Sequence, residues 1–415
     1  MTAPAPILET GGEPGGSGVR GLLAIPAFNG VMLANVLSAV AFGTSRFVFV
    51  WLIGDLTDWN PATAMLGIVI GLPPLLLSAW AGSLADRHDP RRLGVVLFAV
   101  SAVLFAATAL IVTADAMTVP IAMAAAFVTA ITPAMLMPLL QALVPAIVPA
   151  NRLMQAVALQ NLGMMVSTIS GVFFGGVVIQ AFGTGGGFWL LTAACALGVL
   201  RYGTTPLPTR APGAAPQRRG AIRDGARVAL GTEPLRSLMV LTTVMGLAIA
   251  TSTLLLPEFA RDVLGKQSLA ASALNVFMSV GMMITSMLLA TRWTPSRPGL
   301  VLTVMTTTAL GGGLIAIGLS NTYLVTAAIC FVWGTSGGIA MTLLRTLVQV
   351  NTPPGMMGRV MGLSAMAQNG AFPIGALVLV GLVSISSVAT AMVIAGGICT
   401  LGTWLVAARP HLRRA

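Results

Sequence analysis

Residues 85–97 read ADRHDPRRLGVVL, and residues 290–302 read ATRWTPSRPGLVL. Seven of the thirteen positions are identical, at an offset of 205. The identical positions of the first copy are Ala85, Arg87, Pro90, Arg92, Gly94, Val96 and Leu97. Matches of Ala and Leu are frequent by chance in an apolar sequence, so the shared Arg, Pro and Gly residues carry the evidence. A second match, near offset 204, aligns residues 137–159 with residues 341–363. The chain is therefore predicted to consist of two like halves.

Twelve apolar runs fall into two sets of six around this repeat. They occupy residues 29–53, 62–84, 93–114, 118–144, 154–180 and 186–202, and then 236–259, 269–291, 299–319, 322–347, 359–383 and 387–408. A helix needs about 20 residues to cross about 30 Å of hydrocarbon. The runs are continuous, whereas strands of a membrane barrel alternate in polarity. The pattern predicts an all-α membrane protein with twelve transmembrane helices in two pseudo-symmetric six-helix bundles.

Composition supports a membrane protein. Hydrophobic residues make up 56% of the chain and charged residues 8%, against about a quarter charged in soluble domains. The net charge of +11 does not predict a nucleic-acid partner, because the basic residues lie in short gaps between apolar runs. The three cysteines lack metal-ligand spacing, and we expect no metal and no cofactor.

The two sets of runs set the expected domain organisation. We expect a disordered cytoplasmic tail (1–27), an N-terminal six-helix bundle (28–202), a cytoplasmic linker with a short amphipathic helix (203–235), a C-terminal six-helix bundle (236–408) and a basic cytoplasmic tail (409–415). Basic residues are retained on the cytoplasmic side of a membrane. Nearly all arginines fall on one side when both termini are placed there, and the other side keeps Arg261 and Lys266. Both termini are therefore predicted to be cytoplasmic.

The loop after the second run reads GSLADRHDPRR, residues 82–92. It resembles the signature loop of the major facilitator superfamily, in which a glycine precedes an acid-base pair and a basic cluster. The resemblance extends over the whole chain through the helix count, the repeat and the central linker. It implies a cytoplasmic latch that holds the outward-facing state, formed by Gly82, Asp86, Arg87, Arg91 and Arg92. The alternative is that these arginines only fix the topology.

Residues 171–176 read GVFFGG and look like the glycine motif in the fifth helix of antiporters of this superfamily. Gly375 lies near the corresponding place in the second half. Gly171, Gly175, Gly176 and Gly375 are consistent with tight helix packing or with antiport. Together with NRLMQA at residues 151–156 and GRVM at residues 358–361, they make the chain most similar to the bacterial exporter branch that includes enterobactin exporters.

The first run carries an arginine inside the hydrocarbon, where ionisable groups are expensive and usually functional. At 100° per residue, Asn35, Phe42, Arg46 and Phe49 fall within about 60° of one another. This helix lines the central cavity in the superfamily, so the stripe is expected to face a substrate with an anionic or carbonyl group. Alternatively, Arg46 could snorkel to the headgroups. Arg46 or a neighbour is further expected to pair with Glu258, at the end of the seventh run, in an outer gate.

Further polar residues inside the runs are expected to line the cavity or to bond between helices. They are Gln160, Asn161, Asn275, Gln368 and Asn369. No carboxylate lies near the middle of any run. Proton coupling would therefore have to use Asp55, Glu258 or Asp86, near run ends, or protons carried by the substrate; the alternative is a transporter without proton coupling.

These features predict a monomeric secondary transporter in the inner membrane that exports a small, partly lipophilic solute such as a siderophore, metabolite or drug. An importer or lipid translocase on the same fold is the alternative. An enzyme is disfavoured, because His88 and His411 lie far apart and no converging catalytic groups are evident. The expected partners are a small-molecule substrate, the lipid bilayer and protons.

Overall fold

The computed structural model describes residues 19–57, 61–87, 89–149, 152–207, 227–291, 297–353 and 357–407. These residues form helices and short turns, and no strand occurs within the described ranges. The first half contains α1 (Val19–Leu23), α2 (Pro26–Leu56), α3 (Pro61–Arg87), α4 (Pro90–Thr113), α5 (Val119–Ile147) and α6 (Leu153–Gly203). The second half contains α8 (Glu233–Asp262), α9 (Ser268–Thr291), α10 (Pro298–Thr306), the π-helical turn η2 (Thr307–Gly312), α11 (Gly313–Leu319), α12 (Tyr323–Val350), α13 (Met357–Ile385) and α14 (Val388–Ala407).

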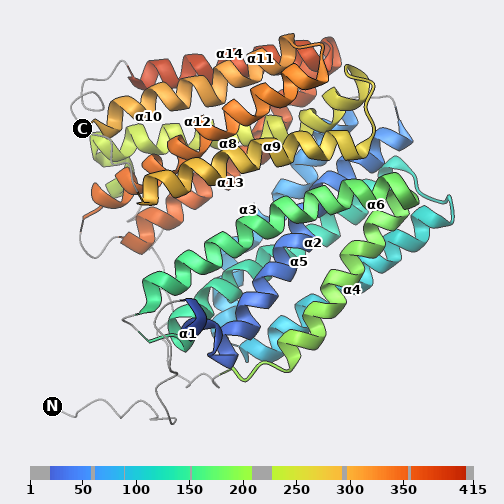
Figure 1. Ribbon diagram of the computed structural model, residues 1–415, viewed down its shortest axis with the longest axis vertical. Coiled ribbons are helices and arrows are strands. Elements are labelled where there is room, and N and C mark those ends of the chain that lie inside the picture. The colour runs from blue at the N-terminus through green and yellow to red at the C-terminus, as the bar shows by residue number, and fades with distance from the viewer. Residues whose placement is uncertain are drawn as a thin grey trace.

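Helix α6 holds two of the expected spans. Its backbone is non-helical at Gly183, with φ 70° and ψ −178°, a conformation that glycine adopts without a Cβ clash. The chain reverses there, so the predicted runs 154–180 and 186–202 become two legs of one hairpin (Figure 1). In the second half, the run predicted at 299–319 is a single span built from α10, η2 and α11.

The number of crossing segments agrees with the prediction. Ten helices in the described parts of the chain are long and apolar enough to cross a membrane, and residues Pro61–Leu77 of α3 form a shorter apolar helix. Counting α3 and the two legs of α6 separately gives twelve segments, six in each half. The predicted all-α fold of twelve transmembrane helices is confirmed.

Helix starts follow local chemistry. Proline stands at the beginning of α2, α4 and α10, where its missing N–H would have no helical partner. At α4 the carboxylate of Asp89 also accepts a hydrogen bond from the Arg91 backbone N–H, 2.8 Å long. A capped helix with proline at its first position begins sharply, so the turn from α3 into α4 is short.

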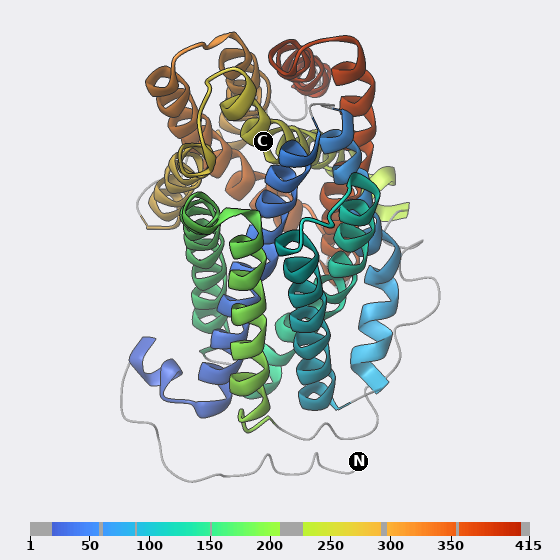
Figure 2. The ribbon, with the colours of Figure 1, turned by 90° about the vertical axis from the view of Figure 1, so that its right-hand side faces the viewer.

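The two halves form two bundles, which lie closest where α2 ends and diverge toward the side where α2 begins (Figures 1 and 2). Across the boundary, α3 packs against α13 and the first leg of α6 packs against α9. The second span of each half thus contacts the fifth span of the other half. This reciprocal pairing is what a two-fold axis between two parallel repeats produces.

Helices α2 and α8, the first spans of the two halves, lie at the centre. In each, 67% of the most apolar window is buried, against at most 50% in the other spans. Central helices are covered by protein on most sides, so their polar residues face other helices or an internal space rather than lipid. This position makes α2 and α8 the first elements to search for a site.

The predicted tail and linker overlap with helices at their edges. Helix α1 and the start of α2 lie within the expected tail 1–27, and α8 begins within the expected linker 203–235. The linker also contains helical residues 227–231. The first part of the expected amphipathic helix, residues 222–226, and the basic tail 409–415 lie outside the described residues.

Candidate functional site

A pocket of about 180 Å³ lies between the two bundles, where α2 and α3 face α8 and α13. It is lined by Arg46, Gly71, Pro74, Gly246, Ile249, Gln368, Asn369 and Phe372. Each bundle contributes to the wall, so a relative movement of the bundles changes the shape of the pocket. Three of the residues predicted for the cavity, Arg46, Gln368 and Asn369, are brought together here.

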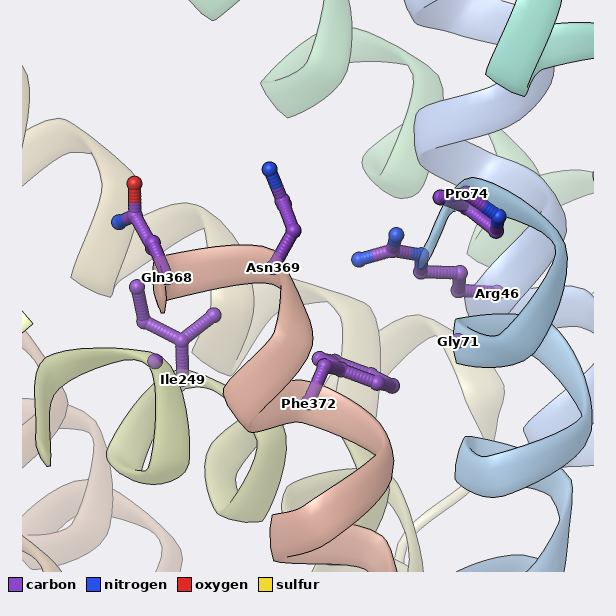
Figure 3. A pocket seen from close by; sticks show the side chains of 8 residues that line it. Arg46, Gly71, Pro74, Ile249, Gln368, Asn369 and Phe372 are labelled. Atoms are coloured by element: carbon purple, nitrogen blue, oxygen red, sulfur yellow. The ribbon is translucent and has the colours of Figure 1, made fainter. Parts of the chain in front are cut away.

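Arg46 reaches across the boundary between the bundles. Its guanidinium carbon lies 4.8 Å from the centroid of the Phe372 ring, which is within the range of a cation–π interaction. Figure 3 shows the guanidinium of Arg46 and the amide of Asn369 extending into the same space, with the Phe372 ring below them. The side chain therefore points into the pocket, as a substrate contact would, and not along the helix toward headgroups.

Glycines set the close approach of the helices around the pocket. A Cβ built on Gly71 of α3 would lie 2.9 Å from Cδ of Pro373 in α13. A Cβ on Gly246 of α8 would overlap the carbonyl oxygen of Gln368. Any larger residue would push α13 outward, so these two glycines fix the width of the pocket at its α13 wall.

The aromatic residues of the predicted α2 stripe lie elsewhere. The Phe42 ring packs 6.1 Å from Phe105 of α4, and the Phe49 ring packs edge-on at 4.9 Å from Phe188 of α6. Both are buried in the core of the N-terminal bundle. Asn35 is also buried, and neither polar atom of its side chain has a partner among the described residues. Of the four stripe residues, the pocket is lined by Arg46 alone.

Two of the remaining predicted polar residues, Gln160 and Asn275, do not line this pocket. Gln160 is buried, and its amide nitrogen has no partner in the described part of the chain. Asn275 donates a hydrogen bond of 3.4 Å to the carbonyl oxygen of Ala271, one turn earlier in α9. The side chain of Asn161 lies outside the described residues.

A second group of polar side chains joins the bundles where α2 ends, and we call it the gate cluster. It consists of Trp51, Asp55, Thr63, Glu258 and Arg261. An Nη atom of Arg261 lies 3.3 Å from a carboxylate oxygen of Asp55, and its guanidinium carbon lies 5.5 Å from the Trp51 ring centroid. Thr63 donates a hydrogen bond to Glu258. Two residues of α8 thus bind α2 and α3 of the other bundle.

The gate cluster differs from the expected pairing of Arg46 with Glu258. The structure separates these two residues, since Arg46 contacts Phe372 and Glu258 contacts Thr63. Arg261 was not expected to take part. Its signal in the sequence was its isolation, because it is the one arginine in the loops of a side whose other charged residues are Lys266 and several Asp and Glu residues. Gly54 makes room for it, since a Cβ there would overlap the guanidinium.

The predicted latch is only partly described. The side chains of Gly82, Asp86 and Arg87 lie outside the described residues. Arg92 is exposed. Arg91 donates a hydrogen bond of 2.8 Å from Nε to the carbonyl oxygen of Gly203, at the end of α6. That contact joins two helices of the same bundle, so in this conformation Arg91 anchors α4 to α6.

The glycines of the predicted packing motif all lie at close helix contacts. Gly171 and Gly175 of α6 face Thr44 of α2, and a Cβ on Gly175 would lie 2.5 Å from the Thr44 methyl. Gly176 faces the other bundle, where its carbonyl oxygen accepts a hydrogen bond of 3.0 Å from Ser268. A Cβ on Gly375 of α13 would lie 2.7 Å from Leu247 of α8.

The profile of the Major Facilitator Superfamily matches residues 31–376, most of the chain. The chain belongs to this superfamily. It is therefore a multi-pass membrane transporter of small molecules and not an enzyme. No curated protein sequence matches the chain at a significant level. Among the described residues of this superfamily member, no group of His, Cys, Asp and Glu side chains is arranged to hold a metal ion.

Solved structures of other transporters share the fold. A mutant of the nucleoside transporter NupG matches with a TM-score of 0.77 and 12% identity, covering 92% of this chain and 98% of that one. The peptide transporter POT in complex with sulfate matches with a TM-score of 0.71 and 14% identity, covering 94% and 95%. A bacterial homologue of the human lysosomal transporter Spinster, inward-facing and unoccupied, matches at 0.69 and 14%, covering 92% and 95%. At such identities the likeness concerns the fold alone.

Proposed function

We propose that this superfamily member exports a small, partly lipophilic solute, such as a siderophore, metabolite or drug, from the cytoplasm across the inner membrane. The observation that carries the proposal is the pocket between the bundles, where Arg46, Gln368, Asn369 and the Phe372 ring line one space. Polar groups and an aromatic face in one pocket suit a solute that has both an apolar body and a polar end.

The expected orientation supports loading from the cytoplasm. The gate cluster lies at the end that the arginine distribution assigns to the periplasm, and both termini are assigned to the cytoplasm. Along α2, Arg46 precedes Asp55 by nine residues, or about 13 Å of helix rise. Substrate in the pocket is thus separated from the periplasm by the closed cluster, and it enters from the side where the bundles diverge.

The pocket chemistry narrows the substrate. Arg46 supplies a charged donor for an anionic or carbonyl oxygen, and the amides of Gln368 and Asn369 supply weaker, adaptable partners. Pro74, Ile249 and Phe372 offer apolar contact. A compact polar sugar would leave these apolar walls uncovered, whereas an aromatic or alkyl solute with one acidic or carbonyl group would cover both kinds of wall.

A deletion strain tests the direction of transport. Cells lacking the gene are expected to retain more of an exported siderophore or drug than the parent strain, and an uncoupler is expected to abolish the difference if an ion gradient drives export. Lower retention in the deletion strain would favour the importer and overturn export. If the deletion strain retains small solutes as the parent does, but its lipids are distributed differently between the two leaflets, a lipid translocase would be favoured instead.

Variants of Arg46 test the pocket with the compound that the deletion strain retains. Removing a charge-assisted hydrogen bond costs about 1.5–3 kcal/mol, or roughly 10- to 150-fold in affinity. Arg46→Ala is expected to lose affinity by that factor, and Arg46→Lys by less. Arg297→Ala, at an exposed arginine that begins α10, is the control. Equal affinity in Arg46→Ala and Arg297→Ala would refute the substrate role.

A further inference from the structure

Glu258 is a buried carboxylic acid at the boundary between the bundles. Its side chain is 5% exposed, and Thr63 of α3 donates a hydrogen bond to one of its oxygens, Oε1. The other oxygen, Oε2, is buried and has no hydrogen-bond partner within the described residues. A carboxylate buried with an unpartnered oxygen is destabilised relative to the same group in water. Protonation removes that penalty.

The charges around Glu258 do not neutralise it directly. On its own helix, Arg261 directs an Nη atom to Asp55 of α2 and stacks on Trp51, and Asp262 adds a negative charge nearby. The described side chains of α3 and of α9, which also pack against α8, include no charged residue. The only charged residue of α13 is Arg359, near its start, and α14 has none. Of the other helices that pack against α8, α12 carries Arg345 near its end and α2 carries Arg46, which lies over Phe372. Arg261 is thus shared with Asp55, and no cation is dedicated to Glu258.

The Glu258 site is coupled to the conformation by its position. Thr63 belongs to one bundle and Glu258 to the other, so separation of the bundles at this end breaks their hydrogen bond and admits water to both carboxylate oxygens. The closed conformation favours the neutral acid, and an open conformation favours the solvated anion. Thermodynamic linkage then requires that proton binding favours closure.

We propose that Glu258 is a proton-binding site whose occupancy holds the gate cluster closed, so that pH sets the balance between the closed and open conformations of the transporter. The inference rests on alternating access as the proposed function. A proton from bulk water binds Oε2 when the outer end closes, and it returns to water when the bundles separate and the carboxylate is solvated. The step adds one proton to one carboxylate and needs no other reactant.

A metal cation does not fit this position. Hard cations require several oxygen ligands, whereas Glu258 presents one free carboxylate oxygen and has the guanidinium of Arg261 three residues further along the helix. No metal-binding group of acidic, His or Cys residues occurs in the described parts of the chain. A proton needs only the one oxygen.

Distance measurements between two spin labels test the coupling without any substrate. Ala116→Cys and Gln267→Cys place labels on exposed residues of the two bundles at the end that carries the gate cluster, in a chain whose buried cysteines, Cys195, Cys330 and Cys399, are replaced by Ala. With the protein in nanodiscs, pulsed electron paramagnetic resonance is expected to show a short distance between the two labels at low pH. As pH rises, the population with a longer distance is expected to grow. Glu258→Gln is expected to keep the shorter distance at every pH.

Two further variants decide between Glu258 and its neighbours. Glu258→Asp keeps a carboxylate and is expected to retain the pH-dependent shift, which separates loss of titration from misfolding. Asp55→Asn removes the partner of Arg261 and is expected to favour the longer distance while remaining pH-dependent. A pH response that persists in Glu258→Gln would overturn the proposal, and so would its loss in Asp55→Asn.

Infrared spectroscopy supplies a second readout on the same samples. Acidification is expected to produce a carboxylic acid C=O band that is absent in Glu258→Gln. A response to Na⁺ concentration at constant pH, with no response to pH, would also overturn the proposal. Both measurements are made without substrate. A failed export assay therefore does not contradict proton binding at Glu258, and a negative result in these measurements does not contradict export.

Discussion

Gly176→Ala is expected to open the end of the transporter that carries the gate cluster. Gly176 lies on α6 where the first leg meets α9 of the other bundle, and the Ser268 hydroxyl donates to its carbonyl oxygen over 3.0 Å. An added Cβ would lie 2.6 Å from Cβ of Ser272 and 2.9 Å from the carbonyl oxygen of Ser268. The second of these is a backbone atom, so α9 as a whole has to move away from α6.

The size of the effect follows from the contact. Forcing one extra methyl group into a packed contact costs about 1–3 kcal/mol. The gain in helix propensity from Gly to Ala applies equally to the open and closed states, since α6 is helical in both, and it cancels. The whole strain therefore acts on the conformational equilibrium, and the ratio of open to closed molecules is expected to rise by roughly 5- to 150-fold.

The spin labels at positions 116 and 267 report this ratio directly, at a pH where the unsubstituted protein is mostly closed. Gly175→Ala is the matched control, because its Cβ would meet the methyl group of Thr44 within the same bundle at 2.5 Å. That variant is expected to lower thermal stability without shifting the label distance. An unchanged distance in Gly176→Ala, or an equal shift in Gly175→Ala, would refute the packing assigned to this glycine pair.

Three further perturbations have defined outcomes. Asp55→Asn removes a half-exposed ion pair worth about 0–1 kcal/mol. In the same label experiment it should raise the ratio of open to closed molecules by up to about 5-fold. A larger shift would mean that the ion pair is stronger than its exposure suggests. Gly246→Ala should lower the free energy of unfolding by about 1–3 kcal/mol, measured by denaturant titration, whereas Gly397→Ala, with open space around its Cβ, should not. Tyr202→Phe loses the 3.1 Å hydrogen bond to the Pro90 carbonyl oxygen and should lower it by about 0.5–1.5 kcal/mol; no change would show that water replaces the bond.

The fold was predictable because its causes are local and additive. The length of each apolar run is set by the thickness of the hydrocarbon, and the shared Arg, Pro and Gly residues of residues 85–97 and 290–302 reveal the duplication. The reversal at Gly183 falls between the predicted fifth and sixth runs, and both legs belong to one continuous helical element. Arg46 was singled out for its cost in hydrocarbon, and the pocket contains it.

The pairing across the gate was not predictable. Helix periodicity placed Phe42, Phe49 and Arg46 on one side of α2, yet the two rings pack against α4 and α6 while Arg46 faces α13. The reason is that α2 is central, so that most of its surface meets protein. A helical wheel cannot tell one protein neighbour from another. Likewise, the symmetry between the first spans of the two halves suggested that Arg46 or a neighbour pairs with Glu258. In the structure, Glu258 accepts a hydrogen bond from Thr63, and Arg261 pairs with Asp55.

Hydropathy, charge placement and internal repetition therefore established that this chain is a two-fold bundle of twelve membrane helices, because each of these signals depends on the chain and its solvent alone. Which side chains meet between the bundles was decided only by the tertiary structure. Those contacts depend on helix rotation, on how closely helices approach at Gly71 and Gly176, and on the room that Gly54 leaves for the Arg261 side chain. These are properties of two surfaces together.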